Sequence, residues 1–99
     1  MPYRIECSPE AEDHLRALTA RERSIVLDTV EEQLVHEPNV ETKNRKPMRP
    51  NPVAPWELRI DRLGVYYDVK EEPQQAVKVR AVGTKDRNQV RIGSEVIEL

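Results

Sequence analysis

The sequence contains no phenylalanine, one cysteine and only three glycines among its 99 residues. The single cysteine, Cys7, cannot form an internal disulfide, so a reducing compartment is expected. Cys7 alternates with Tyr3 and Ile5, which indicates a buried strand cysteine rather than a catalytic thiol. No apolar run approaches the roughly 20 residues of a membrane span, and the N-terminus lacks the apolar core of a signal peptide. We therefore expect a cytoplasmic protein that has no contact with a membrane.

Common catalytic motifs are missing as well. The sequence has no nucleophile elbow, no glycine-rich phosphate loop and no paired cysteines. Its two histidines, His14 and His36, are 22 positions apart, and this spacing brings no carboxylates with it to complete a metal site. We interpret both histidines as polar surface or helix-end residues, and expect neither a metal nor another cofactor.

The length predicts a single domain covering residues 1–99. Only 37% of the residues are hydrophobic, so we expect a thin core that a partner protein helps to cover. The net charge of −2 does not suggest a nucleic-acid binder, but the charges are unevenly distributed. Residues 1–36 carry eight acidic and four basic side chains, whereas residues 42–62 carry six basic and two acidic ones. A basic region therefore follows an acidic one.

The first third of the chain has the pattern of a strand followed by two helices. Ser8 before Pro9 is typical of a helix N-cap and first helical position, and the run from Thr19 to Glu22 matches a capping box. The apolar positions expected to face the core are Ala11, Leu15 and Leu18 in the first helix, and Val26, Leu27, Val30 and Leu34 in the second, which ends before Pro38.

The segment 38–55 contains five of the eight prolines and predicts a long ordered or semi-extended loop, a feature that is usually functional. Three alternating patterns then predict strands of an antiparallel meander with one solvated face: Trp56, Leu58, Ile60; Val65, Tyr67, Val69; Val77, Val79, Ala81. Residues 90–97, with Gly93 and Ser94 as a two-residue turn, suggest a terminal β-hairpin. The expected fold class is α+β, with two N-terminal helices packed on an antiparallel sheet of about four strands.

Basic side chains are the chemistry that remains. One basic run contains Lys43, Arg45, Lys46 and Arg49 and is interrupted by proline, which keeps the chain extended. An extended basic segment can bind the phosphates of a nucleic acid. Such a run by itself is more often a solvated loop. Arg59 and Arg62 follow closely, and Lys85, Arg87 and Arg91 come after the last central strand. We expect adjacent strand ends to bring these cations onto one surface.

The order of these features resembles the RelE/ParE superfamily of toxins from type II toxin–antitoxin systems. The resemblance covers nearly the whole chain and is carried by 56–60 (WELRI), 65–69 (VYYDV) and 81–88 (AVGTKDRN) behind the strand, the two helices and the basic loop. It implies a compact sheet with two N-terminal helices and, for the RelE branch, ribosome-dependent cleavage of mRNA by attack of a ribose 2′-hydroxyl on the adjacent phosphate. It also implies an antitoxin partner that blocks the toxin.

Individual positions depart from the RelE pattern. Gly64 stands where the family usually has a strand arginine, and Arg62 is the nearest substitute. Lys85 stands at the position of a catalytic arginine, and Arg91 at that of a frequent tyrosine. By alternation Tyr67 belongs to the core, and Tyr66 is the exposed residue, able to stack on a base or to donate a proton.

We therefore expect a toxin that acts as a ribosome-dependent, metal-independent mRNA endoribonuclease, with a cognate antitoxin and mRNA on the ribosome as partners. A ParE-like poison of DNA gyrase, a non-cleaving binding module of the same fold and an unrelated adaptor remain the alternatives, and the oligomeric state is not readable from the sequence. The candidate catalytic residues are Arg59, Lys85, Arg87, Arg62, Tyr66 and Arg91, and the candidate RNA-binding residues are Lys43, Arg45, Lys46 and Arg49.

Overall fold

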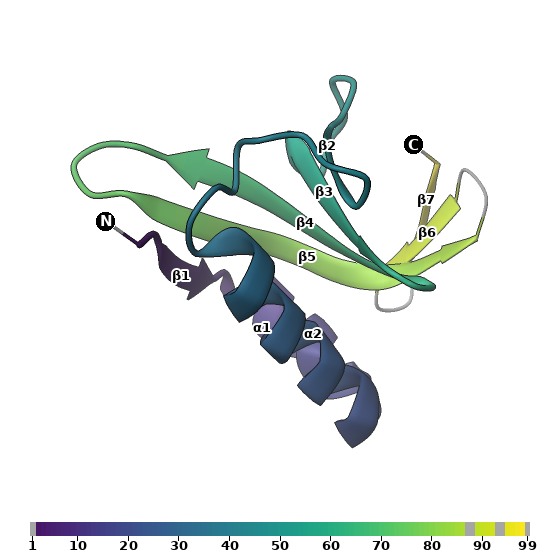
Figure 1. The fold of residues 1–99 in the computed structure, drawn as a ribbon. Helices are drawn as coiled ribbons and strands as arrows, with labels where there is room; N and C mark the ends of the chain where they lie inside the picture. The colour runs from purple at the N-terminus through teal and green to yellow at the C-terminus, as the bar shows by residue number, and fades with distance from the viewer. Residues whose placement is uncertain (1, 87–88, 93–94, 99) are drawn as a thin grey trace.

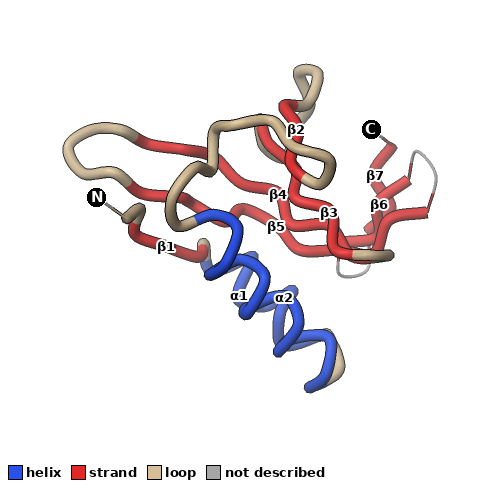
Figure 2. The backbone as a smooth tube through the Cα atoms, in the orientation of Figure 1, coloured by secondary structure: helices blue, strands red, loops and turns tan. Residues whose placement is uncertain are grey.

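The computed structural model describes residues 2–86, 89–92 and 95–98. Figure 1 shows the helices covering one face of a twisted sheet, with a terminal hairpin at one end of the sheet. Figure 2 shows the same arrangement by type of element, with the long loop that follows the helices passing over the sheet. We call the face of the sheet that points away from the helices the open face. Among the described residues, no helix is long and apolar enough to cross a membrane.

Both helices begin where the sequence predicts. Helix α1 (Pro9–Ala17) is capped by Ser8, whose side chain accepts a hydrogen bond from a backbone N–H of the first turn. Helix α2 (Ala20–Leu34) starts with the predicted capping box, in which Thr19 and Glu22 exchange hydrogen bonds of 3.0 and 3.1 Å. Each cap satisfies a backbone donor that has no partner within the helix and contributes about 1 kcal/mol.

In the part of the chain that the structure describes, seven strands form one sheet in the order β2-β3-β4-β5-β6-β7, with β1 paired to β5. Their bounds are β1 Arg4–Cys7, β2 Arg45–Pro47, β3 Trp56–Ile60, β4 Leu63–Lys70, β5 Ala76–Asp86, β6 Gln89–Ile92 and β7 Glu95–Glu98. Strands β3 to β5 form the predicted antiparallel meander, and β6 pairs with β7 as the predicted hairpin, whose turn residues lie outside the described residues.

The prediction of about four antiparallel strands is too low in number and wrong in direction for β1. Strand β1 runs parallel to β5. Both β1 and β6 pair with β5, β1 with its first residues and β6 with its last. With 11 residues, β5 is long enough to pair with β1 along its first part and with β6 along its last part.

The proline-rich loop is more structured than predicted. Strand β2 lies inside it and pairs with β3. Beyond β2, the backbone N–H of Met48 donates to the carbonyl of Pro55 over 2.8 Å and closes the segment between them. Asn51 holds this closed segment from within: its side chain donates to two backbone carbonyls and accepts from the backbone N–H groups of Val53 and Ala54. The segment is therefore a folded loop, because the amide of Asn51 replaces the missing backbone partners.

An irregularity in β5, opposite Tyr66 and Tyr67 of β4, places Val79 and Ala81 on different faces of the sheet. Tyr66 pairs with Ala81 and Tyr67 with Val79, so Arg80 is an extra residue on β5. Because such a bulge shifts the alternation of side chains, Ala81 lies on the open face although Val79 faces the helices. The sequence pattern placed Val79 and Ala81 in one regular alternation.

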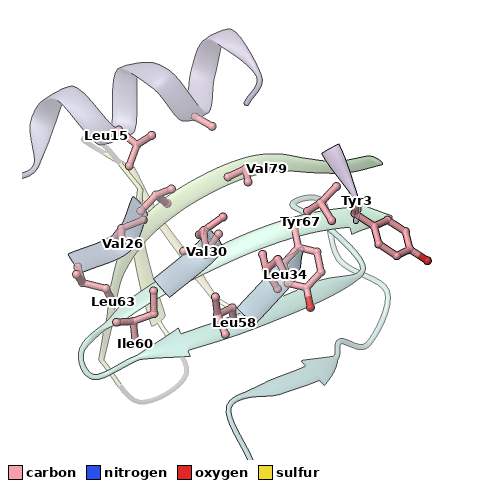
Figure 3. Close-up of a cluster of buried hydrophobic side chains, with 14 residues drawn as sticks. Tyr3, Leu15, Val26, Val30, Leu34, Leu58, Ile60, Leu63, Tyr67 and Val79 are labelled. Carbon is pink, nitrogen blue, oxygen red and sulfur yellow. The ribbon is translucent and has the colours of Figure 1, made fainter. Parts of the chain in front are cut away.

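The main core lies between the helices and the sheet. Figure 3 shows Leu15, Val26, Val30 and Leu34 from the helices pointing toward strand residues such as Leu58. Burying such a side chain contributes roughly 1.5–3 kcal/mol. Leu27, which we predicted in this core, is 46% exposed. It follows Val26 directly in α2 and so points away from the sheet.

A second, smaller cluster occupies the open face, which the sequence pattern predicted to be solvated. Its buried members are Ala54, Tyr66, Ala81, Val90 and Ile92. The terminal hairpin and the proline-rich loop supply three of these residues, so these two elements cover part of the open face. Glycine at position 83 permits this packing, because a Cβ there would lie 2.4 Å from the backbone oxygen of Arg91 on β6.

Candidate active site

The candidate site is centred on Glu57, a buried carboxylate on the open face. Strand pairing places Lys46, Glu57 and Tyr66 in one row across β2, β3 and β4. Lys85 lies on β5 opposite Val90, a member of the open-face cluster, so its side chain projects to the same side. Three neighbouring strands and the edge strand β2 thus contribute to one cluster, which we call the Glu57 cluster: Lys46, Glu57, Tyr66 and Lys85.

Glu57 is fully buried and is held by three polar partners. The Tyr66 hydroxyl donates to Glu57 Oε2 over 2.9 Å, and Lys85 Nζ lies 3.2 and 3.1 Å from the two carboxylate oxygens. Lys46 Nζ lies 3.8 Å from Oε1. A buried charge is tolerated only when it is paired and hydrogen-bonded, and Glu57 meets this condition.

Tyr66 is completely buried, so our prediction that it is exposed is wrong. The terminal hairpin and the proline-rich loop cover its ring on the open face. Burial is the main cause that raises the pKa of Tyr66 above its ordinary value, and the charge and hydrogen bond of Glu57 act in the same direction. Tyr66 therefore keeps its proton and orients the carboxylate of Glu57.

Gly64 makes this arrangement possible. A Cβ at position 64 would lie 2.6 Å from the hydroxyl oxygen of Tyr66 and 2.9 Å from its Cζ. The end of the Tyr66 ring therefore lies in the space that a side chain at position 64 would occupy. The resemblance implies an arginine at position 64. In this chain the glycine at that position leaves room for Tyr66, whose hydroxyl reaches Glu57 on the neighbouring strand.

Lys85 lies between the buried Glu57 and the solvent. Its side chain is 11% exposed, while that of Glu57 is not exposed at all. Both residues line a hollow of about 380 Å³, which we call the loop hollow. The remaining residues that line it come from β2 and the proline-rich loop: Lys46, Pro47, Met48, Arg49, Pro50 and Asn51. Lys46, Arg49 and Lys85, three of the predicted cations, therefore surround one cavity.

Arg59 belongs to the same face. It alternates with the core residues Leu58 and Ile60 and pairs with Gly64, so it projects to the open face. Its positive charge opposes the rise in the pKa of Tyr66, which reflects its closeness to the cluster. The guanidinium also donates to the backbone carbonyl of Asp61 over 3.2 Å, in the turn after β3.

Arg62 and Arg91 do not join this group. Together with Thr84, Lys85, Gln89 and Val96 they line a second hollow, of about 620 Å³. Thr84 pairs with Arg91, one residue before Lys85, so these two side chains project to the face opposite to that of the Lys85 side chain. The cations that we predicted to share one surface are thus divided between the two faces.

Arg45, which we predicted to bind RNA, is buried and is bonded to backbone carbonyls at the end of α2. It is 7% exposed, and its Nη1 donates to the carbonyls of Gln33 and Glu37 over 2.6 Å each. Gln33 lies in the last turn of α2, where carbonyl groups lack partners within the helix. Arg45 projects there because it pairs with the core residue Leu58 and therefore faces the helices.

The other predicted residues have simple positions. Lys43 is exposed and does not line either hollow, and Arg87 lies outside the described residues. His14 accepts a hydrogen bond from the backbone N–H of Val82 over 3.3 Å, and His36 is exposed. Cys7 is partly buried in β1, and burial raises the pKa of its thiol. Within residues 2–86, 89–92 and 95–98, no group of three or more metal-binding side chains is arranged to hold an ion.

Glu57 is the residue that sequence reasoning missed. Its signal was present: the alternation that places Leu58 in the core also places Glu57 and Arg59 together on the other face. We counted Glu57 only as an acid among bases. An acidic residue inside a strand with bulky apolar neighbours and cations on both sides of it in sequence is a candidate for a buried ion pair.

Comparison with known proteins adds evidence on the fold. No protein-family model matches the sequence, and no curated protein does so either. The structure is similar to a chain in the crystal structure of the toxin–antitoxin complex RelBE2 from Mycobacterium tuberculosis, with a TM-score of 0.73 and 21% sequence identity. The match covers 86% of this chain and 100% of that chain. This chain therefore has the fold of a component of a RelBE toxin–antitoxin complex, as the sequence resemblance implied.

Proposed function

We propose that this protein is the toxin of a type II toxin–antitoxin system and cleaves mRNA on the ribosome. One observation carries the proposal: Lys46, Arg49 and Lys85 surround a single hollow on the open face, with Arg59 on the same face. Cations that converge from separate strands and a loop suit the backbone of an RNA strand, because every nucleotide brings one phosphate.

The chemistry of the hollow fits the reaction that the resemblance implies. Attack of a 2′-hydroxyl on the adjacent phosphate needs a proton acceptor, a proton donor and positive charge for the phosphorane. The arginines contribute charge only, since a guanidinium does not lose its proton in a protein. The proton-exchanging groups that line the hollow are those of Lys46, Glu57 and Lys85.

We propose a cognate antitoxin as the protein partner. The similar structure is that of a toxin–antitoxin complex. An acidic segment that covers the loop hollow would neutralise its cations and exclude RNA, since charge complementarity determines both the rate and the register of such binding. The proposed binding of an acidic antitoxin segment to the open face fits the charge distribution of the chain, in which the open face is basic and the segment that contains the helices is acidic.

The proposal is tested with purified protein and mRNA on programmed ribosomes. We expect the wild type to cut the message, and both Lys85→Ala and Arg49→Ala to reduce the rate by at least tenfold, because each removes a cation of the hollow. Lys43→Ala is the matched control, since it removes an exposed cation of the same basic run that does not line the hollow. Arg49 is exposed, so its loss separates an effect on RNA from an effect on folding.

An intact message in the wild-type reaction would contradict the proposal. Growth arrest with damaged DNA would then indicate a ParE-like action on gyrase. RNA binding without cleavage would indicate a non-cleaving module of this fold.

A further inference from the structure

The contact between Glu57 and Lys85 suggests a specific catalytic role that rests on the proposed function. The two side chains lie 3.1 Å apart, and both line the loop hollow. One is a carboxylate that can accept a proton, and the other is an ammonium that can donate one. A buried ion pair adds little to stability compared with apolar side chains of the same volume, so its presence at the wall of a hollow calls for another explanation.

We propose that Glu57 and Lys85 are the general base and the general acid of the cleavage reaction and restore each other after every turnover. The Glu57 carboxylate takes the proton of the 2′-hydroxyl while the 2′-oxygen forms a bond to phosphorus. The bond between phosphorus and the 5′-oxygen breaks, and the Lys85 ammonium gives its proton to the leaving 5′-oxygen. The products are a 2′,3′-cyclic phosphate and a 5′-hydroxyl.

The return step follows from the distance between the two groups. After cleavage Glu57 is a neutral carboxylic acid and Lys85 a neutral amine. One proton that crosses the 3.1 Å contact restores the carboxylate and the ammonium. The pair thus conserves protons, and neither a histidine nor an outside proton carrier is required for the cycle to close.

Access to Glu57 depends on the lysines that cover it. The carboxylate has no exposed surface, while the Lys46 side chain is 55% exposed and the Lys85 side chain 11% exposed. Both are flexible chains above a carboxylate that lines the hollow. An RNA phosphate in the loop hollow attracts the Lys85 ammonium outward, and this movement opens the carboxylate to the neighbouring 2′-hydroxyl.

Other groups on the open face are unsuited to these two roles. The Tyr66 hydroxyl is buried and donates to Glu57, so it positions the carboxylate and does not reach the substrate. Arg49 and Arg59 cannot exchange protons near neutral pH. Lys46 is farther from Glu57, at 3.8 Å, and extends from the edge strand into solvent, which suits the binding of a phosphate.

The test uses substitutions that preserve charge or shape. Lys85→Arg keeps the positive charge and removes the ability to donate a proton, and Glu57→Gln keeps the shape and removes the base. Each should slow cleavage of a short synthetic mRNA on ribosomes by roughly 100-fold or more, the usual contribution of a general acid or base. Lys78→Arg is the matched control and should keep the wild-type rate, because Lys78 is an exposed lysine on the same strand, β5, and lines neither hollow.

A sulfur-substituted substrate separates the two roles. In an mRNA with sulfur in place of the bridging 5′-oxygen at the cut site, the leaving thiolate needs no proton. Lys85→Arg should then recover to nearly the wild-type rate, while Glu57→Gln should stay slow. Both variants should bind an uncleavable 2′-O-methyl RNA as the wild type does, and their thermal unfolding shows that they are folded.

Three results would overturn the inference. Activity of Lys85→Arg or Glu57→Gln close to wild type on the oxygen substrate removes the assigned role. An equal loss for Lys85→Arg on both substrates means that Lys85 does not protonate the leaving group. If the wild type cuts neither substrate, the proposed function fails together with the inference, whereas in the first two cases the proposed function stands.

Discussion

Removal of the Tyr66 hydroxyl tests whether the Glu57 cluster is an organised buried network. Tyr66→Phe keeps the ring in the open-face core and deletes the 2.9 Å hydrogen bond to Glu57. A hydrogen bond to a charged group contributes about 1.5–3 kcal/mol to stability. We therefore expect the free energy of unfolding to fall by that amount, because the buried carboxylate loses one of its donors and gains no water.

Two other tyrosines provide graded controls. The Tyr67 hydroxyl donates over 2.7 Å to the carbonyl of Pro38 and is buried, so Tyr67→Phe should cost about 1 kcal/mol, the typical value for a neutral acceptor. The Tyr3 hydroxyl donates over 3.0 and 2.7 Å to Glu71, in a partly exposed pair. Water replaces this bond when it is lost, so Tyr3→Phe should cost less than about 1 kcal/mol.

The assay is urea denaturation of the wild type and the three variants at neutral pH. A shift of the midpoint with an unchanged slope reports a change in stability alone. We expect the order Tyr66, then Tyr67, then Tyr3. A loss for Tyr66→Phe no larger than that for Tyr3→Phe would refute the reasoning, since it would mean that Glu57 does not depend on the buried donor.

Three further predictions follow from the packing. Gly83→Ala should destabilise the contact between β5 and β6, because its Cβ would lie 2.4 Å from a backbone oxygen of β6; amide hydrogen exchange of β6 should rise. Arg45→Ala should lower the free energy of unfolding by about 2 kcal/mol or more, because two carbonyls lose a charged donor, yet leave the RNA affinity of the folded protein unchanged in a titration. Burial raises the pKa of Tyr66 and Tyr67 in the folded protein, so their contribution to stability is complete below about pH 10 and is lost as the pH rises further; urea midpoints measured across this range should fall.

The order of the elements could be predicted from the sequence because its signals are local. Ser8 and Thr19 act on backbone groups within three residues, so they determine the starts of the helices wherever the chain goes. The alternation in β3, β4 and most of β5 also repeats within a few residues. It identified the meander and the core position of Tyr67, and these predictions are confirmed.

The candidate site was only partly predictable. Lys46, Arg49, Arg59 and Lys85 share the open face, but Arg62 and Arg91 line another hollow. Which face a strand residue takes depends on register, and the bulge at Arg80 changes that register without a signal that we read in the sequence. Arg87 lies outside the described residues, so its role stays a prediction.

The sequence by itself determined where the two helices begin, where the strands of the meander lie and which stretches are basic, because these depend on near neighbours along the chain. Only the tertiary structure decided which charged groups are buried. Arg45 is buried because it reaches carbonyls 8 and 12 positions away, and Tyr66 and Glu57 are buried where separate segments of the chain meet on one face of the sheet. Burial and charge pairing depend on contacts across the fold. Because of these contacts, the site is a cavity with a carboxylate in its wall, whereas the sequence predicted an exposed basic surface.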